Sequence, residues 1–123
     1  MTRRIAIFEN EFNLLKDAFD LANLVYFSNQ LEFSVFETSQ DFGDLNNVNA
    51  YDKILIDIDL SPKSEKDGIS IMRDIHQLDE HPDMIVLTGH SNIEKKLKEL
   101  GLKIPPILKK PLDVSQIVAS LRV

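Results

Sequence analysis

Four short runs of consecutive apolar residues limit the possible folds of this chain more than any other feature. They alternate with segments in which apolar residues recur every three or four positions, and they are Ile5–Phe8, Ile54–Ile56, Met84–Leu87 and Ile107–Leu108. Strands that are apolar at every position are typical of a parallel sheet buried on both faces, and the wider spacing is typical of helices. The alternation predicts a doubly wound α/β fold, with a parallel sheet covered on both sides.

The segments between these runs complete the predicted order of elements. Residues 31–38 alternate apolar and polar side chains, which indicates a less buried outer strand and makes five strands in all. We predict five helices, in about residues 11–25, weakly in 41–49, after Gly68, after Ser91 and from Asp113 onward.

Signals for helix ends support the last two of these helices. Ser91 is a plausible N-cap, the apolar stripe that follows it includes Leu100, and Gly101 can end the helix. Asp113 and Gln116 have the spacing of a capping box.

Composition and charge exclude several classes of protein. The 123 residues, 43% of them hydrophobic, suit one domain spanning 1–123. Twenty acidic residues against 14 basic ones leave a net charge of −6, which argues against a nucleic-acid partner. The chain has no cysteine, and no apolar run approaches the roughly 20 residues that cross a bilayer. The apolar run near the start is too short for a signal peptide, so we expect a cytoplasmic protein without a membrane partner.

Polar residues follow each of the four buried runs. Glu9-Asn10-Glu11 follows the first run, Asp57 and Asp59 follow the second, Thr88-Gly89 the third and Lys109-Lys110-Pro111 the fourth. Because polar sites of parallel sheets gather at the carboxyl ends of the strands, we expect these side chains to converge on one pocket.

This set of side chains suits phosphoryl transfer to a carboxylate. Asp57 offers a nucleophilic oxygen, and the negative charge of a phosphoryl group must be neutralised as it moves. Glu9, Asn10 and Asp57 can supply the oxygen ligands that Mg²⁺ prefers. Lys110 can hold one phosphoryl oxygen as a point charge, and the Thr88 hydroxyl can donate a hydrogen bond to another.

The order of these motifs resembles that of response-regulator receiver domains, such as single-domain chemotaxis regulators, over essentially the whole chain. The resemblance implies a flavodoxin-like sheet with strand order 2-1-3-4-5. It implies that Asp57 takes a phosphoryl group from a sensor histidine kinase or a phosphotransfer protein in a two-component phosphorelay. It also implies that the ligands of Mg²⁺ are Glu9, Asn10, Asp57 and the backbone carbonyl of Asp59.

The resemblance also implies how the signal leaves the domain. Thr88 would move toward the phosphoryl group, Lys110 would pair with it, and the Lys110-Pro111 bond would be cis. The surface around the last two helices and the last strand would then bind a downstream protein, an effector domain outside these residues, or a second copy in a homodimer. Such a protein assists its own phosphorylation and dephosphorylation but is otherwise not an enzyme.

Three features depart from the family pattern or tune it. Asn10 stands where the family usually has an acid, so one ligand charge is lost. Ile107 stands three residues before Lys110, where the family often has Tyr or Phe. Asp59 and His90 flank the phosphoryl site at positions that influence the lifetime of the phosphoryl group.

Two alternatives stay open on the sequence alone. One is a pseudo-receiver, which uses the same fold as a phosphorylation-independent interaction module and is motivated by Asn10 and Ile107. The other is a hydrolase of the aspartyl-phosphate type, with Asp57 as nucleophile and Asp59 as general acid.

Overall fold

The computed structural model describes residues 2–122 and contains one five-stranded parallel sheet. The strand order is β2-β1-β3-β4-β5, as the receiver resemblance implies. The strands are β1 (Arg3–Phe8), β2 (Leu31–Phe36), β3 (Lys53–Asp57), β4 (Asp83–Thr88) and β5 (Ile107–Lys109). The first strand pairs with both β2 and β3, so it lies inside the sheet although it comes first in the chain.

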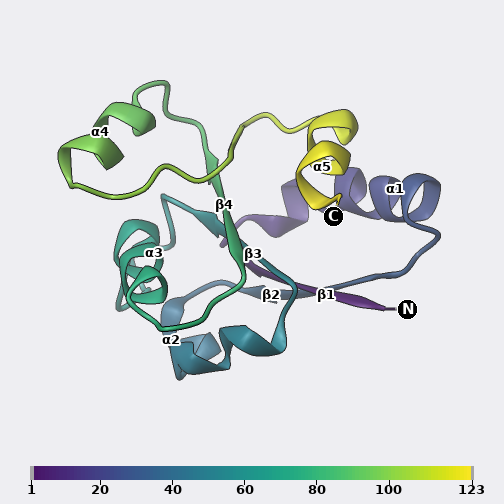
Figure 1. Ribbon diagram of the computed structural model, residues 1–123. Helices are drawn as coiled ribbons and strands as arrows, with labels where there is room; N and C mark the ends of the chain where they lie inside the picture. The colour runs from purple at the N-terminus through teal and green to yellow at the C-terminus, as the bar shows by residue number, and fades with distance from the viewer. Residues whose placement is uncertain (1, 123) are drawn as a thin grey trace.

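Helices cover both faces of this sheet (Figure 1). One face carries α1 (Lys16–Tyr26) and α5 (Val114–Leu121), which pack against each other. The other face carries α2 (Ser39–Phe42), α3 (Gly68–His76) and α4 (Ile93–Glu99). Two 3-10 helices, η1 (Phe12–Leu14) and η2 (Leu45–Ala50), lie in the connections. The predicted doubly wound architecture is confirmed.

The core has two layers because successive side chains of each strand point to opposite faces. Ile5 and Ile7 pack in the cluster under α1 and α5, whereas Ala6 and Phe8 pack in the cluster under α3 and α4. All four side chains are fully buried, whereas Arg3 and Arg4 at the start of the same strand are not, so the apolar requirement applies to residues 5–8.

Several predicted details of the helices are wrong, and each has a local cause. The first helix does not run continuously from residue 11, because a 3-10 turn at Phe12–Leu14 precedes α1. The weak second helix is two short pieces, divided at Gly43, which has a φ of 85°. Asn92 rather than Ser91 is the N-cap of α4. Leu100 is exposed, because α4 ends one residue earlier.

Other end signals are confirmed. The capping box of Asp113 and Gln116 is formed at the start of α5. Gly101 has a φ of 71°, the left-handed conformation that commonly ends a helix. The peptide bond between Lys110 and Pro111 is cis. None of the helices within residues 2–122 combines the length and the apolar character needed to cross a bilayer.

Candidate functional site

The carboxyl ends of the strands bring the predicted polar residues to one edge of the sheet. Asp57 ends β3 and Thr88 ends β4, while Glu9 and Lys110 directly follow β1 and β5. In the register of these parallel strands, Phe8 lies opposite Ile56, Asp57 opposite Leu87, and Thr88 opposite Lys109. Residues separated by up to 101 positions therefore meet because each ends or follows a neighbouring strand.

Lys110 lies between two buried carboxylates at this edge. Its Nζ atom is 3.0 Å from Oδ2 of Asp57 and 2.8 Å from Oε2 of Glu9. Glu9 is fully buried, and only 3% of Asp57 is exposed. Burial lowers the pKa of Lys110, but its interactions with Glu9 and Asp57 outweigh that effect and raise the pKa overall. The ammonium group therefore stays charged and offsets one of the two negative charges.

The second carboxyl group, that of Glu9, is in an environment that disfavours its ionised form. Its Oε1 atom accepts a hydrogen bond of 3.0 Å from the backbone N–H of Glu11, which orients the carboxyl group. Its Oε2 atom has the ion-pair contact to Lys110 but no partner with hydrogen-bond geometry. Burial, followed by the neighbouring Asp57 carboxyl, raises the pKa of Glu9 to about 7. A buried carboxyl oxygen with no hydrogen bond is therefore directed into this site.

Glu9 should make stability depend on pH. Its folded pKa of about 7 exceeds its ordinary value of 4.5, so the folded state binds more protons between these values. In metal-free buffer, the free energy of unfolding should fall by on the order of 2 kcal/mol as pH rises through this interval. Glu9→Gln should remove this decrease, which urea unfolding at a series of pH values would measure.

The matched control for this prediction is Glu32→Gln, because Glu32 is exposed on the outer strand. It should keep the wild-type pH dependence. A Glu9→Gln variant with an unchanged pH dependence would show that Glu9 is ionised in the folded protein across the whole interval.

Asp57 is held at both of its oxygens. Oδ1 accepts a 2.8 Å hydrogen bond from the backbone N–H of Asp59, and Oδ2 accepts one from Lys110. These donors orient the carboxylate at the carboxyl end of β3.

Gly68 is a site residue whose role was not predicted, because in the sequence it served only to mark the start of the third helix. It begins α3, and a Cβ atom at this position would lie 2.1 Å from the backbone oxygen of Asp57. The Asp67 side chain caps the same helix by accepting a hydrogen bond from the N–H of Ser70. The missing side chain at residue 68 therefore allows the start of α3 to contact the acceptor strand. Its signal in the sequence is the Asp67-Gly68 pair, an N-cap residue followed by a residue without a side chain.

Thr88 is placed by its backbone next to Lys110. The Thr88 carbonyl accepts a 2.7 Å hydrogen bond from the N–H of Lys110, and the buried Thr88 hydroxyl accepts one of 3.0 Å from the N–H of His90. This arrangement brings the hydroxyl to the same sheet edge as the Lys110 ammonium group.

Asp59 and His90 meet across the mouth of the site. Oδ2 of Asp59 is 2.5 Å from Nε2 of His90, and both side chains are largely exposed. The two positions that the resemblance associates with phosphoryl lifetime are therefore in contact, although they follow different strands. Ile107 is half-buried against the core cluster under α3 and α4.

The oxygen atoms at this edge of the sheet fit a divalent cation only if the cation keeps several water ligands. Within residues 2–122, no three His, Cys, Asp or Glu side chains are grouped to hold a metal ion. Asn10 is half-buried beside Glu9 in the chain, and its side chain makes no hydrogen bond in the described part of the protein. Glu9 and Asp57 nevertheless present adjacent carboxylates, and Glu9 Oε2 has only its ion-pair contact to Lys110. Mg²⁺ commonly keeps several waters, so two carboxylates and a backbone carbonyl fit it.

The comparison with protein families agrees with this geometry. The sequence matches the response regulator receiver domain over residues 16–122. The chain belongs to this family. The match starts after Glu9 and Asn10, so the acidic residues that follow β1 lie outside it. Receiver domains are signalling phosphoacceptors rather than conventional enzymes, they interact with histidine kinases and effector domains, and they generally use Mg²⁺.

Solved structures support the same fold for this receiver domain. A bacteriophytochrome response regulator has a TM-score of 0.75 at 19% identity, covering 98% of this chain and 76% of the other. A CheY-like receiver domain protein from Methanospirillum hungatei has a TM-score of 0.73 at 17% identity, covering 98% and 91%. DrrB from Thermotoga maritima, an OmpR/PhoB homolog, has a TM-score of 0.71 at 25% identity. The matched region covers 97% of this chain and 50% of DrrB. No curated protein matches the sequence.

Proposed function

We propose that this receiver domain accepts a phosphoryl group on Asp57 from a histidine kinase or a phosphotransfer protein. The observation that supports this most is the contact of Lys110 with both Asp57 and Glu9 at the carboxyl edge of the sheet. A lysine held between two buried carboxylates has little value for stability, because burying three charges is costly. The same arrangement is well suited to receive the negative charge of a phosphoryl group.

In the transfer step, an oxygen of Asp57 forms a bond to phosphorus while the bond from phosphorus to the histidine nitrogen breaks. The electron pair of the broken bond leaves with the imidazole. Lys110 moves from the Asp57 carboxylate to a phosphoryl oxygen, and the Thr88 hydroxyl donates a hydrogen bond to another. A bound Mg²⁺ would neutralise further phosphoryl charge. Glu9, Asn10, Asp57 and the Asp59 carbonyl are the proposed residues that hold it.

The signal is proposed to leave through α4, β5 and α5. Lys110 joins this surface to the acceptor, because it follows β5 directly and its N–H is bonded to Thr88. Leu100 and Ile104 are exposed in the segment between α4 and β5, which suits contact with a downstream protein, an effector domain or a second copy. With Ile107 in place of an aromatic residue, the change must be carried by the backbone and by Thr88 rather than by a rotating ring.

The function is tested by incubating the protein with phosphoramidate and Mg²⁺ and then measuring its intact mass. We expect a gain equal to one phosphoryl group, and chelation of Mg²⁺ with EDTA should reduce the rate of gain by at least about tenfold. A protein that gains no mass under these conditions would contradict the proposal.

A pseudo-receiver is the second candidate, and one observation favours it. Within residues 2–122, only the carboxylates of Glu9 and Asp57 converge at this edge, because Asn10 replaces the usual acid. Titration with Mg²⁺ to millimolar concentrations, followed by amide NMR shifts near Glu9 and Asp57, separates the two functions. Shifts that saturate support the phosphoacceptor, whereas unchanged spectra together with an unchanged mass support the interaction module.

A further inference from the structure

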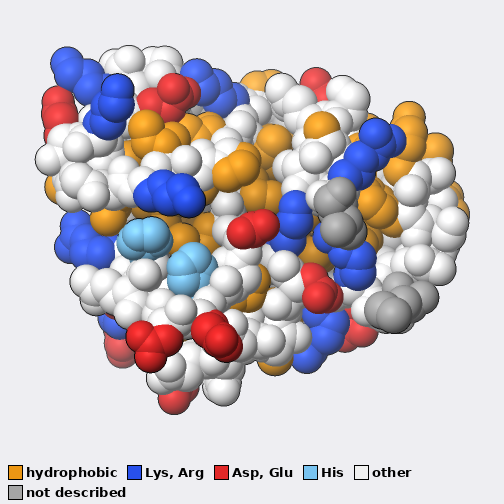
Figure 2. Space-filling model, in the orientation of Figure 1, with side chains coloured by type: hydrophobic (Ala, Val, Ile, Leu, Met, Phe, Trp, Pro, Cys, Tyr) orange, Lys and Arg blue, Asp and Glu red, His pale blue; other side chains and the backbone are white. Residues whose placement is uncertain are grey.

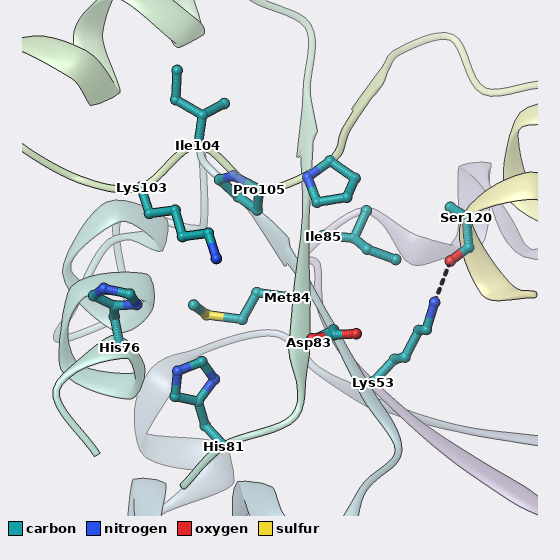
Figure 3. Close-up of a pocket in the computed structure, with 11 residues that line it drawn as sticks. Lys53, His76, His81, Asp83, Met84, Ile85, Lys103, Ile104, Pro105 and Ser120 are labelled. Atoms are coloured by element: carbon teal, nitrogen blue, oxygen red, sulfur yellow. Dashed lines mark hydrogen bonds between the residues drawn. The ribbon is translucent and has the colours of Figure 1, made fainter. Parts of the chain in front are cut away.

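A hollow of about 380 Å³ opens at the end of the sheet opposite to Asp57. It lies where the first residues of β3 and β4 meet the end of α3, the segment between α4 and β5, and the end of α5. Met84 and Ile85 form its buried floor, and Ile104 and Pro105 form part of its wall (Figure 3). We call it the Met84 hollow. The apolar floor and wall of the Met84 hollow offer contact area to a ligand.

The charged residues around the Met84 hollow are mostly basic. Lys53 and Lys103 line it together with His76 and His81, against the single carboxylate of Asp83. In a chain with a net charge of −6, this is a local reversal of sign. Figure 2 shows two histidine side chains beside each other on this face, with a basic side chain above them and hydrophobic atoms exposed between.

Lys53 and Asp83 lie next to each other at one side of the hollow. They are paired neighbours in the register of β3 and β4. The Lys53 ammonium also donates hydrogen bonds of 2.7 Å and 3.2 Å to the carbonyls of Ser120 and Arg122 at the end of α5. In Figure 3 the Asp83 carboxylate points toward this side and away from the histidines. Asp83 therefore does not neutralise the opposite side of the hollow.

That opposite side holds Lys103, His76 and His81 around the Met84 side chain (Figure 3). In the described part of the chain, none of the three makes an ion pair with a carboxylate. The histidine rings lie 5.8 Å apart between centroids, and Nδ1 of His81 is 2.8 Å from the Pro82 carbonyl oxygen. Nδ1 must therefore carry a proton and donate, which leaves Nε2 for a ligand.

A bound metal ion suits this side of the hollow poorly. The Lys103 ammonium points into the same space and would repel a cation, and residues 2–122 provide no third ligand side chain. An anion is favoured by Lys103, and by the histidines when they are protonated.

We propose that the Met84 hollow binds a small organic anion with an apolar body. The anionic group lies between Lys103, His76 and His81, and the apolar body covers Met84 and the neighbouring proline. A pocket with an apolar floor and a few converging polar groups is the usual form of a small-molecule site. The proposal does not rest on the proposed phosphoryl transfer, because the hollow and Asp57 lie at opposite ends of the sheet.

The test uses two fluorescent probes that differ only in the presence of a sulfonate group. The full chain is titrated at about pH 6, where histidines are in general partly protonated. One probe is 8-anilinonaphthalene-1-sulfonate, and the other is N-phenyl-1-naphthylamine, which has the same aromatic body without the sulfonate. We expect saturable binding of one sulfonate probe per chain, with amide NMR shifts at Met84, Lys103 and Ile104, and at least about tenfold weaker binding of the uncharged probe.

Lys103→Gln should weaken binding of the sulfonate probe by about fivefold, since one charged contact is lost. His81→Gln should weaken it as well. Lys95→Gln is the matched control, because Lys95 is exposed on α4, does not line the hollow and changes the net charge equally. Equal affinities of Lys103→Gln and Lys95→Gln would overturn the proposal. Equal binding of the two probes, or amide shifts confined to the exposed apolar residues of α1, would overturn it too.

Discussion

Asp57→Asn is expected to abolish phosphoryl uptake from phosphoramidate, so that the intact mass stays at its starting value in the presence of Mg²⁺. A neutral amide cannot replace the carboxylate as a nucleophile. The variant should fold, because the asparagine oxygen can still accept the hydrogen bond from the N–H of Asp59. Its free energy of unfolding at neutral pH should be equal to or above that of the wild type, since one of two adjacent buried carboxylates is removed.

Asp79→Asn is the matched control for this experiment. Asp79 is an exposed carboxylate in the connection between α3 and β4, and its replacement makes the same change in charge. This variant should gain one phosphoryl group at the wild-type rate. If Asp57→Asn also gained that mass, another residue would be the acceptor and the proposed role of Asp57 would be wrong.

Gly68→Ala is expected to lower the free energy of unfolding by about 3 kcal/mol or more and to slow phosphoryl uptake. The added methyl group would lie 2.1 Å from the Asp57 backbone oxygen, so α3 or the end of β3 must move. Alanine improves helix propensity by less than about 1 kcal/mol, so the clash outweighs that gain. Movement of the Asp57 backbone also displaces its carboxylate from Lys110. Urea unfolding measures the first effect, and the rate of mass gain measures the second.

Gly89→Ala provides the comparison, because a Cβ atom at residue 89 meets no atom within 4 Å. The Gly89 backbone also lacks the positive φ found at Gly43 and Gly101. The change in unfolding free energy at Gly89 should stay below about 1 kcal/mol. A Gly68→Ala protein as stable as Gly89→Ala would mean that the start of α3 adjusts freely beside the acceptor.

Local patterns were sufficient to predict the sheet and the edge at which the site forms. Ile5–Phe8 and Met84–Leu87 are apolar at every position, and only strands covered on both faces bury such runs completely. Once the strands are parallel, whatever follows each of them lies at one edge, so the placement of Asp57 and Thr88 required no knowledge of tertiary contacts. The capping box at Asp113 could also be predicted from the sequence, because its two partners are three residues apart.

The predictions for the two ends of α4 were wrong because a second local signal was equally strong at each end. Ser91 and Asn92 are both good N-cap residues, and the sequence does not decide between them. Leu100 continues the apolar spacing of α4, but the helix ends at Glu99, directly before Leu100 and the left-handed Gly101, and the Leu100 side chain is exposed.

The sequence by itself determined which residues form strands and which polar groups follow them, because burial and periodicity act over a few neighbouring positions. Only the tertiary structure decided that Glu9 is buried against Lys110, that Asp59 contacts His90, and that Gly68 touches the Asp57 backbone. Each of these contacts joins residues that follow different strands, or a strand and a helix. They depend on sheet register and helix packing, which arise from the whole core and have no local pattern in the chain.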